Sequence, residues 1–388
     1  MLKRFAAGYA SLALIVSLAA PSEASAAAIP EKYESKSAPK EIIVKYKDGV
    51  SSTEEKAVVS KLNDSIKENY SAYSVVKITE GSVADAVKEY EANPDVEYAE
   101  PNATYTASYV PNDPDYSTKQ YAPQKVGAEA AWDVTRGSSS VKIAVVDTGV
   151  DYNHPDLAGK VIKGKDFVTD DNDPMDENIH GTHVAGIAAA STNNGVGIAG
   201  LAPNVQILAE RVLDADGSGT LDDVAAGIRH AADSGAQVIN LSLGGPVGTK
   251  TLEDAVNYAA SKGSVVVAAA GNESTPVPSY PAYYENAIAV AATDQNDQIA
   301  YFSNYGPWVD VAAPGVDLYS TVPGGKYESL SGTSMASPVV AGVAGLLASQ
   351  GKNAAQIRTA LESTSDKVTG SGTLFKHGRI NAGKAVAQ

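Results

Sequence analysis

Cysteine is absent from the 388 residues of the chain. Its absence excludes thiol catalysis, cysteine-ligated zinc and disulfide bonds, so stability must come from the core, from metal ions or from slow unfolding. Positive charge is also scarce, because 30 Lys and Arg stand against 46 Asp and Glu, a net charge of −16. Nucleic-acid binding needs Lys and Arg to neutralise phosphates, so this balance argues against a nucleic-acid partner.

Long apolar runs are rare as well. One run extends from Ala6 to Ala20, and after it no stretch reaches the roughly 20 apolar residues of a membrane span. Lys3 and Arg4 precede the run, and the small residues of Ala24–Ala26 follow it. This pattern predicts a signal peptide at residues 1–26 and a secreted, extracellular protein that keeps no membrane association. A membrane anchor agrees less well with so short a run.

The length predicts two or three domains. We expect a flexible segment at 27–40, a small α+β domain at 41–102 and a cleavable linker at 103–108. Within the small domain, alternation predicts strands at EIIVKYK, YSVVKI and VEYAEPN. Residues 51–69 are amphipathic, with Ser52-Thr53 as the expected N-cap, and residues 85–91 follow Ser82 as a short helix.

Residues 109–388 alternate between apolar strands and helices. The strands are nearly continuous β-branched runs, which is typical of a parallel sheet covered by helices on both faces. They read VKIAVVD, VQILAERVL, AQVINLSL, GSVVVAAAG and NAIAVAAT. The expected helices are His183–Ala190, Leu221–Ser234, Leu252–Lys262 and Met335–Ser349. The fold class is therefore α/β with three layers. Glu210 is an isolated acid inside one of these strands and has no evident partner.

Three reactive residues stand at strand–helix junctions of this sheet. Asp147 ends VKIAVVD, His180 precedes a helix in NIHGTHVAG, and Ser334 begins an apolar helix in LSGTSMASP. Functional residues of parallel sheets gather where the strands end. Serine attacks an acyl group when an imidazole takes its proton and a carboxylate orients that imidazole. Each residue alone could be a cap or an ordinary hydrogen-bonding group, so the inference depends on the three together.

The segments VVDTG, HGTHVAG and GTSMASP resemble the subtilase family of serine proteases, in the order Asp, His, Ser known for subtilisin. NLSLGG, AAAGNES and GRINAGKA continue the likeness, and YVPNDP, VLDADGSGT and ATDQND resemble thermitase-like subtilisins in particular. The resemblance implies a subtilisin-like fold, with Asp147 as orienter, His180 as general base and Ser334 as nucleophile. It also implies that Asn272 donates to the oxyanion, together with the backbone N–H of Ser334.

Substrate binding should occur by strand addition to exposed backbone edges. By resemblance, these edges are Gly217-Ser218-Gly219 and Ser242-Leu243-Gly244, and the pocket before the cut is lined by Ala269, Ala270 and Gly271. These pocket residues are small and uncharged, and no acidic selector is visible among them. We therefore expect broad specificity with an apolar or aromatic preference.

Calcium is the expected cofactor, at two or three structural sites. The resemblance implies a first site formed by Asp113, Asp156 and Asn194, and by backbone carbonyls of Ser191, Val196 and Ile198. Carboxylates crowd the stretch DFVTDDNDPMDEN, where a solvated loop is the alternative to a second site. The expected ligands there are Asp166, Asp171, Asp173 and Asp176. Carbonyls of Ala282, Tyr284 and Ala287 are expected to form a weaker third site.

Residues 41–102 resemble the family's inhibitor propeptide and are expected to have a ferredoxin-like fold. This segment should act as an intramolecular chaperone and inhibitor, released by self-cleavage near Tyr109. The expected partners are thus protein and peptide substrates and the propeptide itself, and the mature protein should be a monomer. Two other functions compete: an α/β-hydrolase esterase, which would need G-x-S-x-G, and a calcium-binding or adhesive protein without catalysis. Ser334 stands in no such motif and the order Asp, His, Ser differs from the esterase order of Ser, acid, His, which argues against the first. The complete set of Asp147, His180, Ser334 and Asn272 argues against the second.

Overall fold

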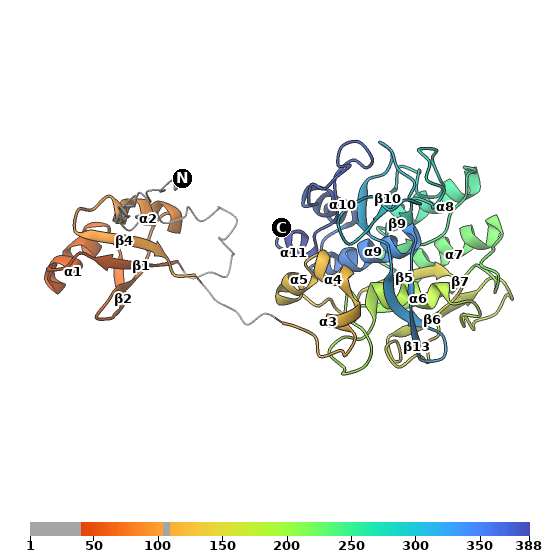
Figure 1. The fold of residues 1–388 in the computed structure, drawn as a ribbon, viewed down its shortest axis with the longest axis horizontal. Helices are drawn as coiled ribbons and strands as arrows, with labels where there is room; N and C mark the ends of the chain where they lie inside the picture. Colours follow the sequence, from red (N-terminus) through yellow and green to blue (C-terminus); the bar gives the residue numbers. More distant parts are fainter. Residues whose placement is uncertain (1–39, 104–108) are drawn as a thin grey trace, which may run out of the picture. The chain divides into compact units, whose positions relative to one another are not determined.

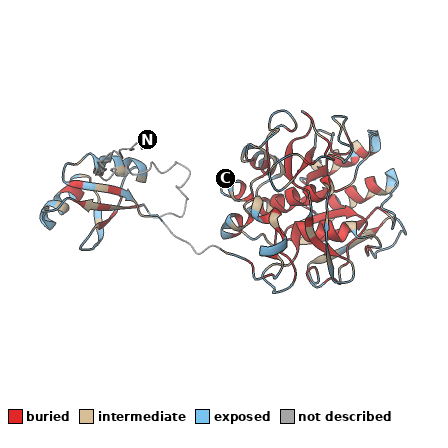
Figure 2. Cartoon of the chain, viewed as in Figure 1, coloured by how far each residue is buried: buried red, intermediate tan, exposed pale blue. Residues whose placement is uncertain are grey.

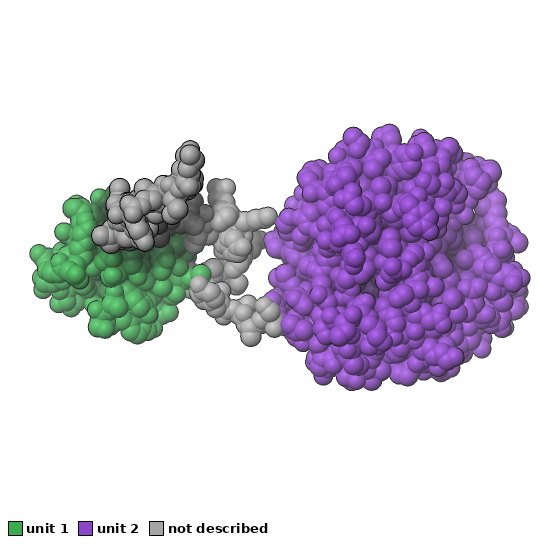
Figure 3. Space-filling view, in the orientation of Figure 1, with its two compact units in different colours: residues 1–106 green, residues 107–388 purple. Residues whose placement is uncertain are grey.

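The computed structural model describes residues 40–103 and 109–388 (Figure 1). These residues form two compact units, one within residues 1–106 and one within residues 107–388 (Figure 3). The predicted signal peptide, nearly all of the segment 27–40 and the predicted cleavage site before Tyr109 lie outside the described residues. No helix in the two described stretches is long and apolar enough to cross a membrane.

The smaller unit is a four-stranded antiparallel sheet in the order β2-β3-β1-β4. Its elements are β1 (Glu41–Tyr46), α1 (Ser52–Lys61), β2 (Ser65–Asn69), β3 (Ser74–Lys77), α2 (Val83–Glu91) and β4 (Val96–Pro101). Both helices contribute to a single core with the sheet, through Val58 and Val59 of α1 and Ala86 and Tyr90 of α2. This βαββαβ arrangement is the ferredoxin-like fold that was expected.

The stretch 51–69 is not one helix, contrary to the expectation from its amphipathic pattern. Helix α1 ends at Lys61, and Asn63 takes a positive φ of 62°, which turns the chain into β2. The N-cap is Ser51 instead of Ser52-Thr53. Ser51 and Glu54 form a capping box, in which each side chain accepts a backbone N–H of the other residue.

The larger unit is built on a seven-stranded parallel sheet in the order β11-β10-β9-β8-β5-β7-β6, which confirms the predicted fold class. Its strands are β5 (Lys142–Asp147), β6 (Val161–Asp166), β7 (Gln206–Arg211), β8 (Val238–Leu241), β9 (Val265–Ala269), β10 (Ala287–Thr293) and β11 (Val311–Pro314). A separate hairpin consists of β12 (Leu318–Val322) and β13 (Lys326–Leu330). The helices are α3 (Tyr116–Lys119), α4 (Tyr121–Lys125), α5 (Ala128–Val134), α6 (His180–Ala189), α7 (Leu221–Asp233), α8 (Lys250–Ser261), α9 (Thr333–Ser349), α10 (Ala354–Ser363) and α11 (Ala382–Val386).

Two apolar cores lie on opposite faces of this sheet. Figure 2 shows that the central helices and strands of this unit are buried. Helices α6 and α9 pack in the first core, and α7 and α8 pack in the second. Successive residues of β5 alternate between them: Ile143 and Val145 face the first, and Ala144 and Val146 face the second. By the same alternation Asp147 turns toward the side of α6 and α9, from which His180 and Ser334 come.

The buried acid Glu210 has two partners in the structure. Its side chain alternates onto the α7 side of β7, where Oε1 lies 2.7 Å from Nδ1 of His230. The pairing of β6 with β7 shifts register between Lys163 and Asp166, and Oε2 of Glu210 accepts the Lys165 N–H at 2.9 Å. Burial raises the pKa of Glu210, and these hydrogen bonds oppose that rise. Glu210 therefore satisfies a donor that the β-bulge removes from the ladder.

Candidate active site

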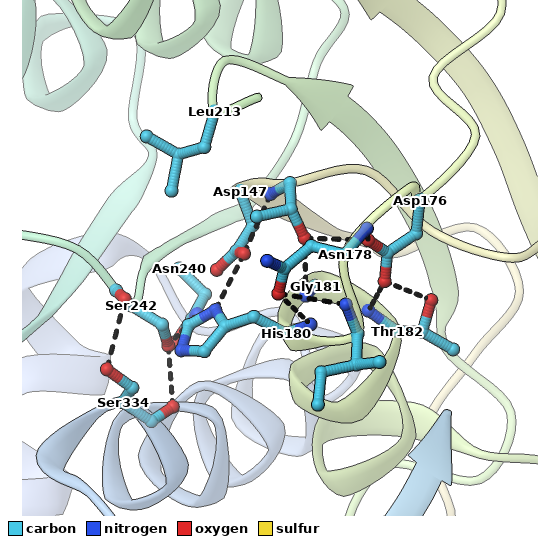
Figure 4. Close-up of polar contacts among 12 residues, drawn as sticks. Asp147, Asp176, Asn178, His180, Gly181, Thr182, Leu213, Asn240, Ser242 and Ser334 are labelled. Carbon is cyan, nitrogen blue, oxygen red and sulfur yellow. Dashed lines mark hydrogen bonds and ion pairs between the residues drawn. The ribbon is translucent and has the colours of Figure 1, made fainter. Parts of the chain in front are cut away.

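Asp147 lies at the carboxyl end of the central strand β5, between β8 and β7. The next strands, β6 and β7, lie on one side of β5, and β8 to β11 lie on the other side. Such a switch point is where parallel α/β sheets bind ligands. The carboxylate is fully buried. Its Oδ1 accepts the backbone N–H of Thr148 at 2.7 Å and lies 2.7 Å from Nδ1 of His180 (Figure 4). This arrangement fixes the imidazole so that Nε2 faces away from the carboxylate.

His180 is the first residue of α6, and the segment before it is held by one side chain. Oδ1 of Asn178 accepts the backbone N–H groups of Ile179 and His180, at 2.9 and 3.2 Å. Burial lowers the pKa of His180, but the charge and hydrogen bond of Asp147 and the charge of Asp176 outweigh it, so the net shift is upward. The carboxylates therefore stabilise the protonated imidazole, as a catalytic base requires.

Gly181 allows the start of α6 to approach β5 closely. A Cβ at this position would lie 2.1 Å from the carbonyl oxygen of Gly149 and 3.2 Å from Cβ of Asp147. The backbone N–H of Gly181 donates to Oγ1 of Thr148 at 2.9 Å. The absence of a side chain thus lets His180 reach Asp147.

Ser334 is the second residue of α9 and rests on a buried polar network. Its Oγ donates to the carbonyl oxygen of Ser242 at 3.1 Å, and Oγ of Ser242 donates to the carbonyl oxygen of Ser334 at 2.7 Å (Figure 4). Asn240 donates to Oγ of Ser242, and Oγ of Ser337 donates to Asn240. Among the described hydrogen bonds none joins Ser334 to Nε2 of His180, and such bonds often tighten only with substrate.

Asn272 is oriented by the residue before the nucleophile. Its Oδ1 accepts the backbone N–H and the hydroxyl of Thr333, at 2.8 and 3.0 Å, which leaves Nδ2 to donate elsewhere. A Cβ built on Gly332 would lie 3.6 Å from the Ser334 nitrogen and 3.7 Å from Nδ2 of Asn272. Both predicted oxyanion donors therefore border the same space above Gly332.

A pocket of about 240 Å³ adjoins the nucleophile. Its lining includes the predicted residues Leu243, Gly244, Ala269 and Gly271, together with Asn272 and Ser334. Ala270 is not part of it, because its side chain is buried in the second core. The side chains of Ala269 and Ala270 turn to opposite sides, and the assignment of Ala270 to the pocket stays a prediction.

Glu273 also lines this pocket, although no acid was expected there. Its side chain is exposed, and Oε2 accepts a hydrogen bond from Nδ2 of Asn304 at 2.7 Å. Within the described part of the chain no Lys or Arg pairs with it. The expectation of an uncharged pocket is therefore corrected, and the adjacency of Glu273 to Asn272 was the signal that could have shown it.

The other predicted substrate edge is a tight, exposed turn. Gly217 takes a positive φ of 79°, and the Asp214 N–H donates to the carbonyl oxygen of Ser218 at 2.8 Å. A Cβ on Gly219 would lie 2.2 Å from the carbonyl oxygen of Val212. Nδ2 of Asn178 donates to the carbonyl oxygen of Ala215 at 2.8 Å, which ties this turn to the segment before His180.

The residues of the first predicted calcium site lie together. Oδ1 of Asp156 accepts from Nδ2 of Asn194 at 2.9 Å, and Asp113 accepts the backbone N–H of Asn194 at 3.2 Å. Both carboxylates are buried, and burial, with the charge of Asp156 added, raises the pKa of Asp113. The backbone also brings in Ser191 and Ile198, whose N–H groups donate to Asp156, while the Val196 N–H donates to Asn194.

The second predicted site is not formed by four convergent carboxylates. The described residues contain no group of three or more His, Cys, Asp or Glu that could hold a metal. Asp166 is buried against Arg211 at 3.0 Å. Asp173 pairs with Lys163 and Tyr152, Asp171 accepts from Thr169 and the Asp173 N–H, and Asp176 bonds toward α6. Each carboxylate has its own partners, which the dense spacing in the sequence could not reveal.

One carbonyl of the third predicted site, that of Ala287, contacts the side chain of Arg358. Nη2 of Arg358 donates to the carbonyl oxygens of Ala287 and Glu285, at 2.6 and 3.2 Å. The Tyr284 carbonyl accepts the Ala287 N–H at 2.9 Å. The guanidinium competes with an ion for the Ala287 carbonyl, one of the three predicted ligands, and an ion at Ala282, Tyr284 and Ala287 stays a prediction.

Among the remaining histidines, His183 and His154 are structural. Nε2 of His183 lies 3.0 Å from the Glu328 carbonyl oxygen, and burial lowers the pKa of His183 to about 4. Nδ1 of His154 accepts the Asp156 N–H at 3.1 Å. His183 therefore joins α6 to β13, and His154 stabilises the loop that contains Asp156.

Comparisons with known proteins show the family of the chain. A sequence model of the Subtilase family matches residues 138–379, and one described as a fervidolysin N-terminal prodomain matches residues 19–102. The chain belongs to the subtilase family: it is a subtilisin-like serine protease preceded by a prodomain.

Individual relatives match most of the chain. A thermophilic serine proteinase of Bacillus sp. (strain AK1) is 58% identical over 353 residues, which cover 89% of this chain and 87% of that protein. Thermitase of Thermoactinomyces vulgaris is 64% identical over 278 residues, covering 72% of this chain and 99% of thermitase. A solved protease structure from Pseudoalteromonas arctica PAMC 21717 matches with a TM-score of 0.66 and 34% identity, over 72% of this chain and 99% of that one.

Proposed function

We propose that the chain is the precursor of a secreted endopeptidase that cleaves proteins through Asp147, His180 and Ser334. The observation that carries this proposal is the 2.7 Å contact between Nδ1 of His180 and the buried carboxylate of Asp147. The chain also provides a serine at the start of α9 and two donors that border one space. This set performs acyl transfer and has no evident purpose in a binding protein.

In the acylation step, Oγ of Ser334 attacks the carbonyl carbon of the scissile peptide bond. Nε2 of His180 takes the hydroxyl proton, and Asp147 stabilises the imidazolium that forms. Ser334 first leaves its hydrogen bond with the Ser242 carbonyl, which a rotation about its Cα–Cβ bond achieves. The imidazolium then gives the proton to the leaving amine, and the acyl-enzyme remains.

Deacylation repeats these steps with water as the nucleophile. His180 takes a proton from water, the hydroxide attacks the ester carbon, and Ser334 recovers its proton as the acid product leaves. In both steps Nδ2 of Asn272 and the Ser334 N–H donate to the oxyanion. Thr333 holds the Asn272 amide in the required orientation, since it occupies Oδ1 from two sides.

Substrate preference should be broad, with apolar and aromatic residues favoured before the cut. Leu243, Ala269 and the backbone of Gly244 and Gly271 form a mainly apolar pocket with room for a large side chain. Glu273 adds one negative charge at its rim and should also admit lysine. The exposed turn at 217–219, and the exposed Gly244 after the partly exposed Leu243, should pair with an extended peptide.

We further propose that the prodomain inhibits the protease until self-cleavage near Tyr109, after the signal peptide has directed secretion. The prodomain has its own core, built from residues such as Ile42, Val44 and Tyr90. A relative described as an extracellular serine protease, Nep of Natrialba magadii, is 43% identical over 365 residues. The mature enzyme should act as a monomer.

One calcium ion should bind at Asp113, Asp156 and Asn194, with carbonyl oxygens of Ser191, Val196 and Ile198. All of these donors are oxygen atoms, which suit a hard cation. Asp113 and Asp156 are buried and form no ion pair within the described residues, so a bound cation would offset the cost of burying their charges. When bound, the ion supplies that charge and stabilises the folded state by mass action.

The test compares purified wild-type precursor with the Ser334→Ala precursor, with and without EDTA. Casein cleavage, the N-terminus and the half-life at raised temperature are measured. Wild type should mature to a chain that begins near Tyr109 and should cleave casein, whereas Ser334→Ala should stay full length. EDTA should shorten the half-life of the mature enzyme.

A folded wild-type chain that neither matures nor cleaves casein would contradict the proposed activity. A half-life that EDTA and added calcium leave unchanged would contradict the calcium site alone.

A further inference from the structure

Asp176 is a buried carboxylate for which the proposed reaction has no role. Only 5% of the residue is exposed, and no Lys or Arg in the described residues pairs with it. Oδ1 accepts from Oγ1 of Thr148 and from the Asn178 N–H, both at 2.9 Å. Oδ2 accepts from the N–H of Thr182 at 3.0 Å and from its hydroxyl at 2.6 Å. Both oxygens are therefore fully engaged by neutral donors.

These donors belong to the two segments that carry Asp147 and His180 (Figure 4). Thr148 directly follows Asp147, and its backbone N–H donates to Oδ1 of Asp147. Thr182 lies in the first turn of α6, two residues after His180. The Thr148 hydroxyl in turn accepts the Gly181 N–H at 2.9 Å. One carboxylate thus connects the end of β5 to the start of α6.

We propose that Asp176 is a positioning residue of the catalytic site, which sets the contact between Asp147 and His180 and places a second negative charge near the imidazole. The inference rests on the proposed function of His180 as the general base. Asp176 lies at the N-terminus of α6. This position suits a carboxylate, because the first backbone N–H groups of a helix lack partners within the helix.

A metal-ligand role for Asp176 is less consistent with these contacts. All four hydrogen bonds would compete with an ion for the same lone pairs, and the other carboxylates of the loop point to other partners. Asp173, three residues earlier, shows the contrast. Its side chain is 59% exposed and pairs with Lys163.

The charge of Asp176 should also influence the pH dependence of catalysis. The titratable groups that face His180 are Asp147 from β5, Asp176 from the loop before α6, and His183 from α6 itself. Burial lowers the pKa of His180, and the charges of Asp147 and then Asp176 raise it. Removal of the Asp176 charge should therefore lower the pKa of His180.

The experiment uses Asp176→Asn and, as a matched control, Asp173→Asn, which removes the same charge from the same loop. Wild type and Ser334→Ala run in parallel and test the proposed function independently. For each mature enzyme, kcat and KM on a peptide substrate are measured from pH 5 to 9. Asp176→Asn should lower kcat about 10-fold to 100-fold with KM nearly unchanged, as expected for a misplaced catalytic group.

The acid limb of kcat/KM should move to lower pH in Asp176→Asn and stay in place in Asp173→Asn. Because a slow variant could fail to mature, the His180 pKa is also measured by NMR titration in full-length precursors that carry Ser334→Ala. The same downward shift should appear there. A purely structural role would lower the melting temperature without moving the His180 pKa.

A folded Asp176→Asn enzyme with wild-type kcat and an unmoved His180 pKa would overturn the inference, provided that wild type is active and Ser334→Ala is not. If Asp176→Asn does not fold, Thr148→Val removes one of the same links and keeps the charge. It should lower kcat with little change in the His180 pKa, and unchanged kcat would overturn the positioning role.

Discussion

Replacement of Gly181 by alanine tests how closely α6 must approach β5. The new Cβ would lie 2.1 Å from the Gly149 carbonyl oxygen, well below the 3.0 Å that real Cβ contacts require. The first turn of α6 must therefore withdraw by about 1 Å, and a displacement of this size can cost ~100-fold in rate. If His180 moves away from Asp147 by the same distance, the 2.7 Å contact between Nδ1 and Oδ1 lengthens beyond hydrogen-bond range.

We expect Gly181→Ala to lower kcat ~100-fold, which corresponds to about 2.7 kcal/mol in the barrier, with a small change in KM. The measurement is kcat per active site, with active sites counted by a covalent serine inhibitor. Gly378→Ala is the control, because its Cβ would lie 2.2 Å from the Asp366 carbonyl oxygen, away from the catalytic residues. It should lower the melting temperature and leave kcat unchanged. Wild-type kcat in folded Gly181→Ala would refute the reasoning.

Four further predictions concern charge. Because the pKa of His180 is raised and the neutral imidazole is the base, kcat/KM should fall on acidification with a midpoint above about 6.5; a lower midpoint would contradict this. Glu273→Gln should slow cleavage after lysine by about fivefold relative to phenylalanine, as for an exposed charge pair, and an unchanged ratio would exclude a role for Glu273. Asp156→Asn should abolish the rise of melting temperature with added calcium, whereas a persistent rise would place the ion elsewhere. The pKa of His183 is lowered to about 4, so its stabilising contribution is complete above about 6.5 and is lost as pH falls toward 4. Removing it in His183→Asn should flatten the melting temperature over that range, and an unchanged slope would assign the acid sensitivity to other groups.

The central strands of the sheet could be predicted because both of their faces are buried. Residues of β5, β8, β9 and β10 are apolar at nearly every position, which the covering helices require. The edge strand β6 was missed for the complementary reason. β6 contains Lys163 and Lys165 around Gly164, is only partly buried and includes a bulge, so it has no apolar run to detect.

The catalytic residues could be predicted because each stands in a short contiguous segment next to a strand or helix end. What the sequence could not reveal were partners distant along the chain. Arg358 reaches Ala287 across 71 residues, and Asp166 finds Arg211 across 45. The sequence of a carboxylate-rich loop is the same whether its acids bind one ion together or each accept hydrogen bonds from separate donors. Only the tertiary contacts of the loop distinguish these two arrangements.

The Arg358 guanidinium at the carbonyls of Glu285 and Ala287 has a consequence for the durability of an enzyme in dilute surroundings. A bound ion dissociates as its concentration falls, whereas a charge carried on the chain has a constant effective concentration. A chelator cannot remove this group, because it is covalently part of the chain. At Glu285 and Ala287, the chain itself therefore supplies a positive group that dilution cannot remove.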